Sequence, residues 1–165
     1  MSDILQQVSG PERSYWLLAV FIIGVFGIGT AVGIGFTPGV WYAGLAKPSF
    51  NPPDWLFGPV WSVLYVMIAV AGWRSFSAEA FGPQSLLWLA QMVLNFAWSP
   101  VMFGLQMLWP AFVVLSLMWL AIVAFIIVAW ANGDRVSAAL FMPYLAWVSF
   151  AGLLNITLAQ MNPAA

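Results

Sequence analysis

Five long stretches of this chain contain no charged residue, and each is long enough to cross a lipid bilayer. A membrane-spanning helix needs roughly 20 mostly apolar residues. The stretches run over about residues 15–36, 55–73, 86–103, 110–130 and 136–161. The segments between them contain turn-forming residues, such as Asn132-Gly133-Asp134-Arg135. The sequence therefore predicts an all-α membrane protein, a bundle of five transmembrane helices that forms a single domain over residues 1–165.

Composition supports a lipid environment, because only 5% of the residues are charged. A soluble domain has about 25% charged residues and uses them to cover its water-facing surface. The first stretch is too long for the apolar core of a typical secretory signal and has no convincing cleavage site after it, so we expect it to remain as a helix.

The missing residue types exclude several chemistries. The chain has no cysteine and no histidine, so we expect no disulfide, no metal site and no cysteine or histidine catalysis. The net charge of −1 gives no reason to expect a nucleic-acid partner. None of the five stretches contains the charged residues that ion-coupled pumps normally carry in the membrane.

The few cations predict an orientation. With five spans, Arg13, Arg74 and Arg135 share one side of the membrane, and Lys47 is on the other. The positive-inside rule then places the N-terminus in the cytoplasm and the loop over residues 37–54 outside.

The tryptophans fall into two groups. Trp16, Trp73, Trp88 and Trp130 lie near span ends, where indole rings favour the headgroup region, and we interpret them as an interfacial belt. Trp61, Trp98, Trp119 and Trp147 lie inside spans, and a belt does not explain them.

Polar and aromatic residues recur on single faces of three predicted helices. These faces contain Trp61 and Tyr65; Gln91, Asn95 and Trp98; and Tyr144, Trp147, Ala151 and Asn155. An amide that faces lipid would be left unpaired, so these faces should point inward. Trp61 lies roughly 9 Å below the 37–54 loop at 1.5 Å per residue, and the other faces reach a similar depth.

The loop over residues 37–54 is rich in proline and aromatic residues. Pro48, Pro52 and Pro53 exclude a helix across residues 41–55 and limit the freedom of the loop. One interpretation is a lid over an aromatic-lined cavity inside the bundle. The alternative is that the inward amides and rings only join the helices, as in many inert bundles. In the first span, Gly29 and Gly33 fit a close helix contact, within the chain in preference to a dimer.

Several motifs resemble the translocator protein family, also called tryptophan-rich sensory proteins or peripheral benzodiazepine receptors. They are Trp41-Tyr42-x-x-Leu45-x-Lys47-Pro48, Gly58-Pro59-Val60-Trp61, Gln91-x-x-x-Asn95-x-x-Trp98-x-Pro100 and Pro143-Tyr144-Leu145-Ala146-Trp147. They occur in the family's order over about residues 15–158.

The resemblance implies a five-helix bundle, commonly a homodimer, with a ligand pocket under the first long loop. It also implies porphyrins such as protoporphyrin IX as ligands, and isoquinoline or benzodiazepine drugs, with no required cofactor. The positions that match the family's pocket are Trp41, Lys47, Pro48, Trp61, Tyr65, Gln91, Asn95, Trp98, Trp109, Trp147, Ala151, Leu154 and Asn155. Lys47 is the one cation on that side and is expected to meet a porphyrin propionate.

Three functions follow from the resemblance. The leading hypothesis is a tetrapyrrole-binding receptor with a regulatory or transport role. The alternative is light-dependent porphyrin degradation that uses the indoles matching Trp61 and Trp147. A transporter ranks lower, because the chain has no inverted repeat.

Two further expectations concern partners and location. The family's sterol motif needs a Tyr and a cation at the end of the last helix, where this chain has Ile156 and no cation, so sterol recognition through it is not expected. The tail favours a bacterial member in a cell membrane, with the inner and outer membranes left open.

Overall fold

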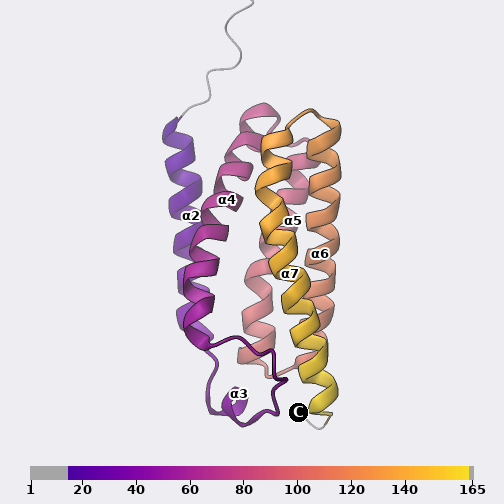
Figure 1. The fold of residues 1–165 in the computed structure, drawn as a ribbon. Coiled ribbons are helices and arrows are strands. Elements are labelled where there is room, and N and C mark those ends of the chain that lie inside the picture. Colours follow the sequence, from indigo (N-terminus) through magenta and orange to yellow (C-terminus); the bar gives the residue numbers. More distant parts are fainter. Residues whose placement is uncertain (1–14, 164–165) are drawn as a thin grey trace, which may run out of the picture.

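Five long antiparallel helices form a bundle in the computed structural model, which describes residues 15–163 (Figure 1). They are α2 (Tyr15–Gly35), α4 (Phe57–Ala78), α5 (Pro83–Ser99), α6 (Leu108–Ala131) and α7 (Arg135–Met161). All five are long and apolar enough to cross a membrane. The chain is thus a multi-pass membrane protein, as its sequence predicts.

The helices follow one another around the bundle in the order α2, α4, α7, α6 and α5. Helices α5, α6 and α7 pack closely, and Phe125 of α6 stacks on Phe141 of α7 with ring centroids 3.9 Å apart. Helix α2 packs chiefly on α4, and only two of its residues, Val25 and Gly29, are buried. The first helix is therefore a peripheral wall of the bundle.

Two helix ends differ from the predicted bounds. Helix α4 continues past Trp73 to Ala78, because Arg74 finds an ionic partner in the bundle. Helix α5 is followed by one π-helical turn, η2 (Pro100–Gly104), in which the Leu105 N–H donates to the Pro100 carbonyl at 2.8 Å. Such turns are rare and occur often beside functional sites.

The loop between α2 and α4 lies across one end of the bundle (Figure 1). The exclusion of helix from residues 41–55 was wrong at the start of this loop, where α3 (Val40–Gly44) forms one short helix. This helix ends four residues before Pro48, so the prolines still exclude helix from the rest of the loop up to Pro53. A 3₁₀ turn, η1 (Asp54–Leu56), leads into α4. We call residues 37–54 the lid.

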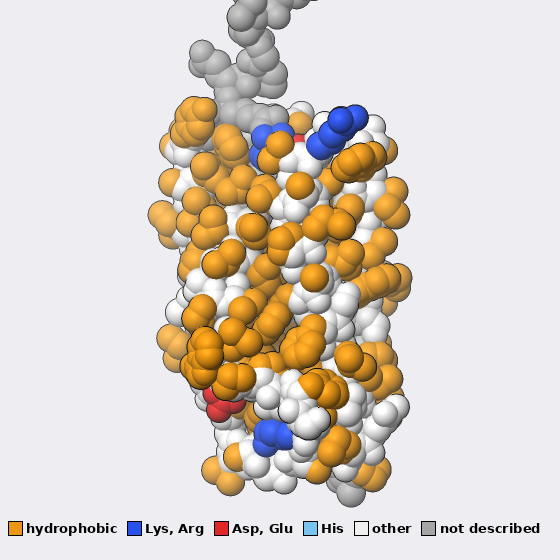
Figure 2. Space-filling model, in the orientation of Figure 1, with side chains coloured by type: hydrophobic (Ala, Val, Ile, Leu, Met, Phe, Trp, Pro, Cys, Tyr) orange, Lys and Arg blue, Asp and Glu red, His pale blue; other side chains and the backbone are white. Residues whose placement is uncertain are grey.

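Side chains around the middle of the bundle are mainly hydrophobic on the face shown in Figure 2, and Lys and Arg lie at its two ends. Arg74 and Arg135 are at the end opposite Lys47, as predicted. Arg13 lies outside the described residues.

Trp16 and Trp130 are 69% and 61% exposed, as an interfacial belt requires, and their place at the headgroups stays a prediction. The belt interpretation was wrong for Trp73 and Trp88, which are buried. The indole N–H of Trp88 donates to the Ile68 carbonyl at 2.8 Å, and its ring lies against Gly72. A missing side chain on the neighbouring helix makes room for this indole in the core.

A polar cluster joins three chain segments at the end opposite the lid. Arg74 of α4 pairs with Asp134 in the α6–α7 turn, with Nε 3.0 Å from Oδ1. Gln84 of α5 donates to the same carboxylate at 3.2 Å, and Ser137 donates to it from the first turn of α7. Burial raises the pKa of Asp134, but these hydrogen bonds outweigh burial and lower its pKa below the ordinary value.

We predict that Asp134→Ala lowers the thermal denaturation midpoint in detergent, through loss of about 1–3 kcal/mol from a charged hydrogen-bond partner and a helix cap. The folded-state pKa of Asp134 is lowered, so its contribution is complete above about pH 4 and is lost as pH falls through the folded pKa. Glu79→Gln is the control, because the exposed Glu79 makes no ion pair among the described residues. Equal midpoints for the two variants would contradict the prediction.

Candidate ligand cavity

A cavity lies inside the bundle toward the lid, and residues of all five long helices line it. Its deep part has a volume of about 390 Å³. A second part of about 370 Å³ lies beneath the lid. The two parts adjoin and share six lining residues: Gly33, Phe57, Trp61, Trp98, Ser99 and Ala151. Known ligand pockets have volumes of roughly 300–1,000 Å³.

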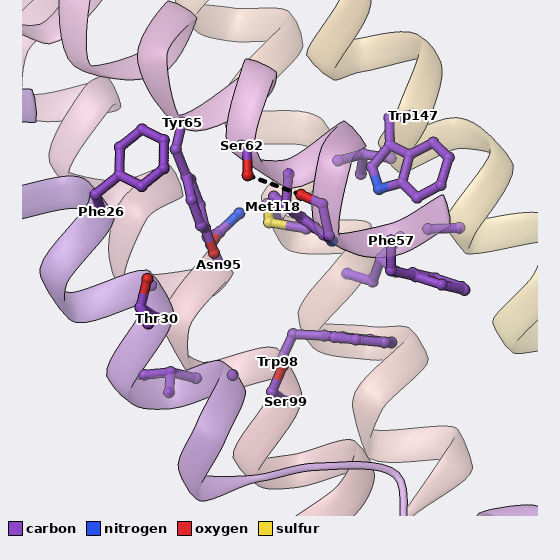
Figure 3. A pocket seen from close by; sticks show the side chains of 18 residues that line it. Phe26, Thr30, Phe57, Ser62, Tyr65, Asn95, Trp98, Ser99, Met118 and Trp147 are labelled. Carbon is purple, nitrogen blue, oxygen red and sulfur yellow. Dashed lines mark hydrogen bonds between the residues drawn. The ribbon is translucent and has the colours of Figure 1, made fainter. Parts of the chain in front are cut away.

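Aromatic side chains from separate helices surround the deep part (Figure 3). Trp61 packs against Tyr65, with ring centroids 5.2 Å apart, and edge-on to Tyr144 at 6.2 Å. Trp147 lies edge-on to Phe57, with centroids 5.7 Å apart. Within residues 15–163, the indole N–H groups of Trp61 and Trp147 make no hydrogen bond.

Two asparagines connect the helices around this cavity. Asn95 of α5 donates to the Tyr144 hydroxyl of α7 at 2.8 Å, and Tyr144 donates to the Met118 sulfur of α6 at 3.2 Å. The Tyr65 hydroxyl of α4 lies 3.5 Å from the Asn95 Oδ1. One buried amide thus joins four helices.

Asn155 forms the second junction, nearer the lid. Its Oδ1 accepts from the Trp98 indole N–H at 3.2 Å, and its Nδ2 donates to the Leu108 carbonyl at 3.0 Å. This pair fixes the plane of the Trp98 ring at the boundary between the two parts of the cavity. The lid-and-cavity and helix-joining interpretations are therefore compatible here: the amides join helices, and the rings line the space between them.

The structure brings eight of the thirteen predicted site residues to the cavity wall. They are Trp61, Tyr65, Asn95, Trp98, Trp147, Ala151, Leu154 and Asn155. The other five do not line either part: Trp41, Lys47, Pro48, Gln91 and Trp109.

The positions of these five have local causes. Leu108, the first residue of α6, points inward and is 1% exposed, so Trp109 turns outward, is 50% exposed and packs on Phe112. Gln91 is buried deeper in the bundle, where its Nε2 donates to the Trp88 carbonyl at 2.9 Å.

The remaining three belong to the lid itself. Trp41 packs on the apolar cluster at the lid end of α6 and α7, and Pro48 is half-buried in the lid. The Lys47 ammonium donates to the Tyr42 and Ala43 carbonyls at 2.7 and 3.1 Å, so it caps the end of α3.

The predicted site residues included none from α2, and those chosen from the lid were not the ones that line the wall. Phe26, Gly29 and Gly33 face the cavity at helical spacing, a periodicity that the sequence contained. Gly29 lies against Tyr65, so the predicted close contact within the chain is present at Gly29. Tyr42 and Asp54 line the part beneath the lid, and no sequence pattern indicated their direction.

The side chain of Asn162, just after α7, hydrogen-bonds to the backbone of the lid. Asn162 accepts from the Ala46 N–H at 2.9 Å and donates to the Ala46 carbonyl at 3.0 Å. It also donates to the Leu158 carbonyl at 2.9 Å, which holds the amide in place. Phe50 of the lid packs edge-on to Phe150 of α7 at 6.4 Å.

These features define a class of protein: a five-helix membrane bundle with a lidded, aromatic-lined internal cavity. Residues 16–161 match the TspO/MBR family, and the chain belongs to that family.

Relatives at similar identity come from bacteria and mammals. Protein CrtK of Rhodobacter capsulatus is 36% identical over 154 residues, which cover 91% of this chain and 95% of that protein. The tryptophan-rich protein TspO of Chlorobaculum tepidum is 38% identical, over 82% of this chain and 93% of its own. The human translocator protein is also 38% identical, over 82% of this chain and 84% of its own. A bacterial origin and a homodimer stay predictions.

We predict that Gly29→Ala weakens ligand binding and lowers the denaturation midpoint. An added Cβ would lie 2.4 Å from the Tyr65 ring, which Phe26 and Trp61 hold in place. Such overpacking costs about 1–3 kcal/mol. Gly24→Ala and Gly27→Ala are matched controls in the same helix, because nothing lies within 4 Å of an added Cβ there. A Gly29 variant that behaves like these controls would contradict the close contact.

We predict that Asn162→Ala loosens the lid. Hydrogen exchange at the Ala46 amide should accelerate on the order of tenfold, because the variant removes the acceptor of this N–H. Asn162→Asp keeps the acceptor but loses both donated bonds. Its exchange rate at the Ala46 amide should therefore lie between those of the wild type and Asn162→Ala. Gln160→Ala, on the exposed face of the same helix end, is the control. Unchanged exchange at Ala46 in Asn162→Ala would show that other contacts hold the lid.

Proposed function

We propose that this protein is a membrane receptor for flat, apolar macrocycles of the porphyrin class, which bind in the lidded cavity. One observation carries the proposal: three indoles from three helices, Trp61, Trp98 and Trp147, line one cavity inside the bundle. Each indole that stacks on a planar ring contributes about 0.5–1.5 kcal/mol, in addition to the free energy of burying apolar surface.

The side chains of the wall favour binding over acid–base chemistry. Asn95 and Asn155 are occupied by bonds between helices, and no charged residue lines the deep part of the cavity among the described residues. Metal-ligand clusters of three or more acidic residues are also absent from that part of the chain. The cavity therefore has the means to hold a planar ligand, and isoquinoline- or benzodiazepine-type compounds fit the same description.

The stacking residues give a direct test. We predict that the double variant Trp61→Ala, Trp147→Ala binds protoporphyrin IX about tenfold to a hundredfold more weakly than the wild type. Binding is followed by porphyrin absorbance, because tryptophan quenching would lose its own reporters. The control is Trp16→Ala, Trp130→Ala, which removes two exposed indoles far from the cavity. Equal affinity in the two double variants would remove the stacking argument.

The same complexes test a photo-oxidative reaction. The specific observation in its favour is that Trp61 and Trp147 adjoin the cavity without a described hydrogen bond to either indole N–H, so both rings are available to a bound sensitiser. Bleaching of illuminated porphyrin that needs the protein and is lost in the Trp61, Trp147 double variant would establish this reaction. Bleaching at the same rate with and without protein would leave binding alone.

A further inference from the structure

One acidic residue lines the part of the cavity beneath the lid. Among the residues that line either part, Asp54 is the one with a charged side chain. It lies in η1, where the lid meets α4, and it is exposed. A ligand that fills this part therefore meets a negative charge at its outer edge.

No cation of the described chain is among the residues that line either part of the cavity. Arg74 pairs with Asp134, and Arg135 lies over Trp130, both at the other end of the bundle. Lys47 is in the lid but faces its own backbone, with carbonyl oxygens of Tyr42, Ala43 and Leu45 at 2.7, 3.1 and 3.4 Å. Its ammonium also lies over the Tyr42 ring, 4.7 Å from the centroid.

Tyr42 shows which charge reaches the cavity. Its side chain lines the part beneath the lid, and Lys47 does not. Burial and the nearby Asp54 carboxylate raise the pKa of the Tyr42 hydroxyl. Tyr42 and the Asp54 carboxylate thus belong to the same wall of the cavity.

We propose that Asp54 makes this site select against carboxylate-bearing ligands, so that its preferred ligand is a flat ring system whose lid-facing edge is neutral or cationic. This rests on the proposed function and narrows its ligand class. It also replaces the expectation that Lys47 meets a porphyrin propionate, because that ammonium is directed to three carbonyl groups of the lid.

The experiment compares two ligands with the same ring, protoporphyrin IX and its dimethyl ester. The first carries two carboxylates and the second carries none. Dissociation constants for both are measured by absorbance in nanodiscs of neutral lipid, for the wild type, Asp54→Asn and Asp54→Lys. The quantity compared is the ratio of the two constants in each variant, because the partition of each ligand into lipid is common to all variants.

We expect the preference for the ester over the diacid to be stronger in the wild type than in either Asp54 variant. Asp54→Asn should change the ratio of the two dissociation constants by about fivefold in favour of the diacid, because it removes a negative charge near water. Asp54→Lys should change it by about tenfold or more, because it also adds a positive charge. Both shifts should shrink at high salt, which screens exposed charges. Glu79→Gln removes a carboxylate at the other end of the bundle and should leave the ratio unchanged.

A folding defect would not imitate this result. The Asp54 side chain makes no described hydrogen bond, and the backbone bond at the end of η1 uses its carbonyl. A change in lid structure would alter both ligands together and leave the ratio in place. A ratio that does not move in Asp54→Asn and Asp54→Lys overturns the charge selection. Failure of both ligands to bind any variant would instead overturn the proposed function.

Discussion

The structure depends on one constraint of the bilayer: a polar group inside it must find its partner within the protein. Asn95 and Asn155 meet this constraint with hydrogen bonds between helices. The bonds around Asn95 join four helices, and those of Asn155 join three. With the amides used in this way, the remaining wall of the cavity is mostly aromatic and apolar. The bonds that join the helices therefore lie beside the cavity, and the stability of the bundle and the shape of the cavity have a common origin.

The two ends of the bundle use polar groups differently. At one end, Arg74, Asp134 and Gln84 join three chain segments through an ion pair and hydrogen bonds. At the other end, Lys47 and Asn162 bond to the backbone of the lid, one within it and one from α7. Aromatic rings of the lid add to these bonds, because Tyr42 packs on Phe103 and Phe50 packs on Phe150. The first end is therefore joined by charged and polar side chains, and the second is covered by a loop that packs on the helices.

Helical periodicity explains how much could be predicted from sequence. Trp61, Asn95, Trp98, Trp147 and Asn155 reach the cavity because inward faces repeat along a helix and amides cannot face lipid. The errors have a different origin. A tryptophan near a span end was read as interfacial, but Gly72 opens space for Trp88 inside the core. Loop side chains such as Lys47 and Asp54 follow no period, and only coordinates show which of them lines the cavity.

The distinction between Lys47 and Asp54 matters because both charges lie at the lid, within one short loop. Their charges sum to zero, so composition alone predicts no net charge at the lid. The backbone carbonyls at the end of α3 hold the ammonium outside the cavity wall, while η1 places the carboxylate on it. The cavity wall therefore contains the carboxylate and not the ammonium. In the charge selection that we propose, one loop residue narrows the ligand class while the aromatic cavity stays the same.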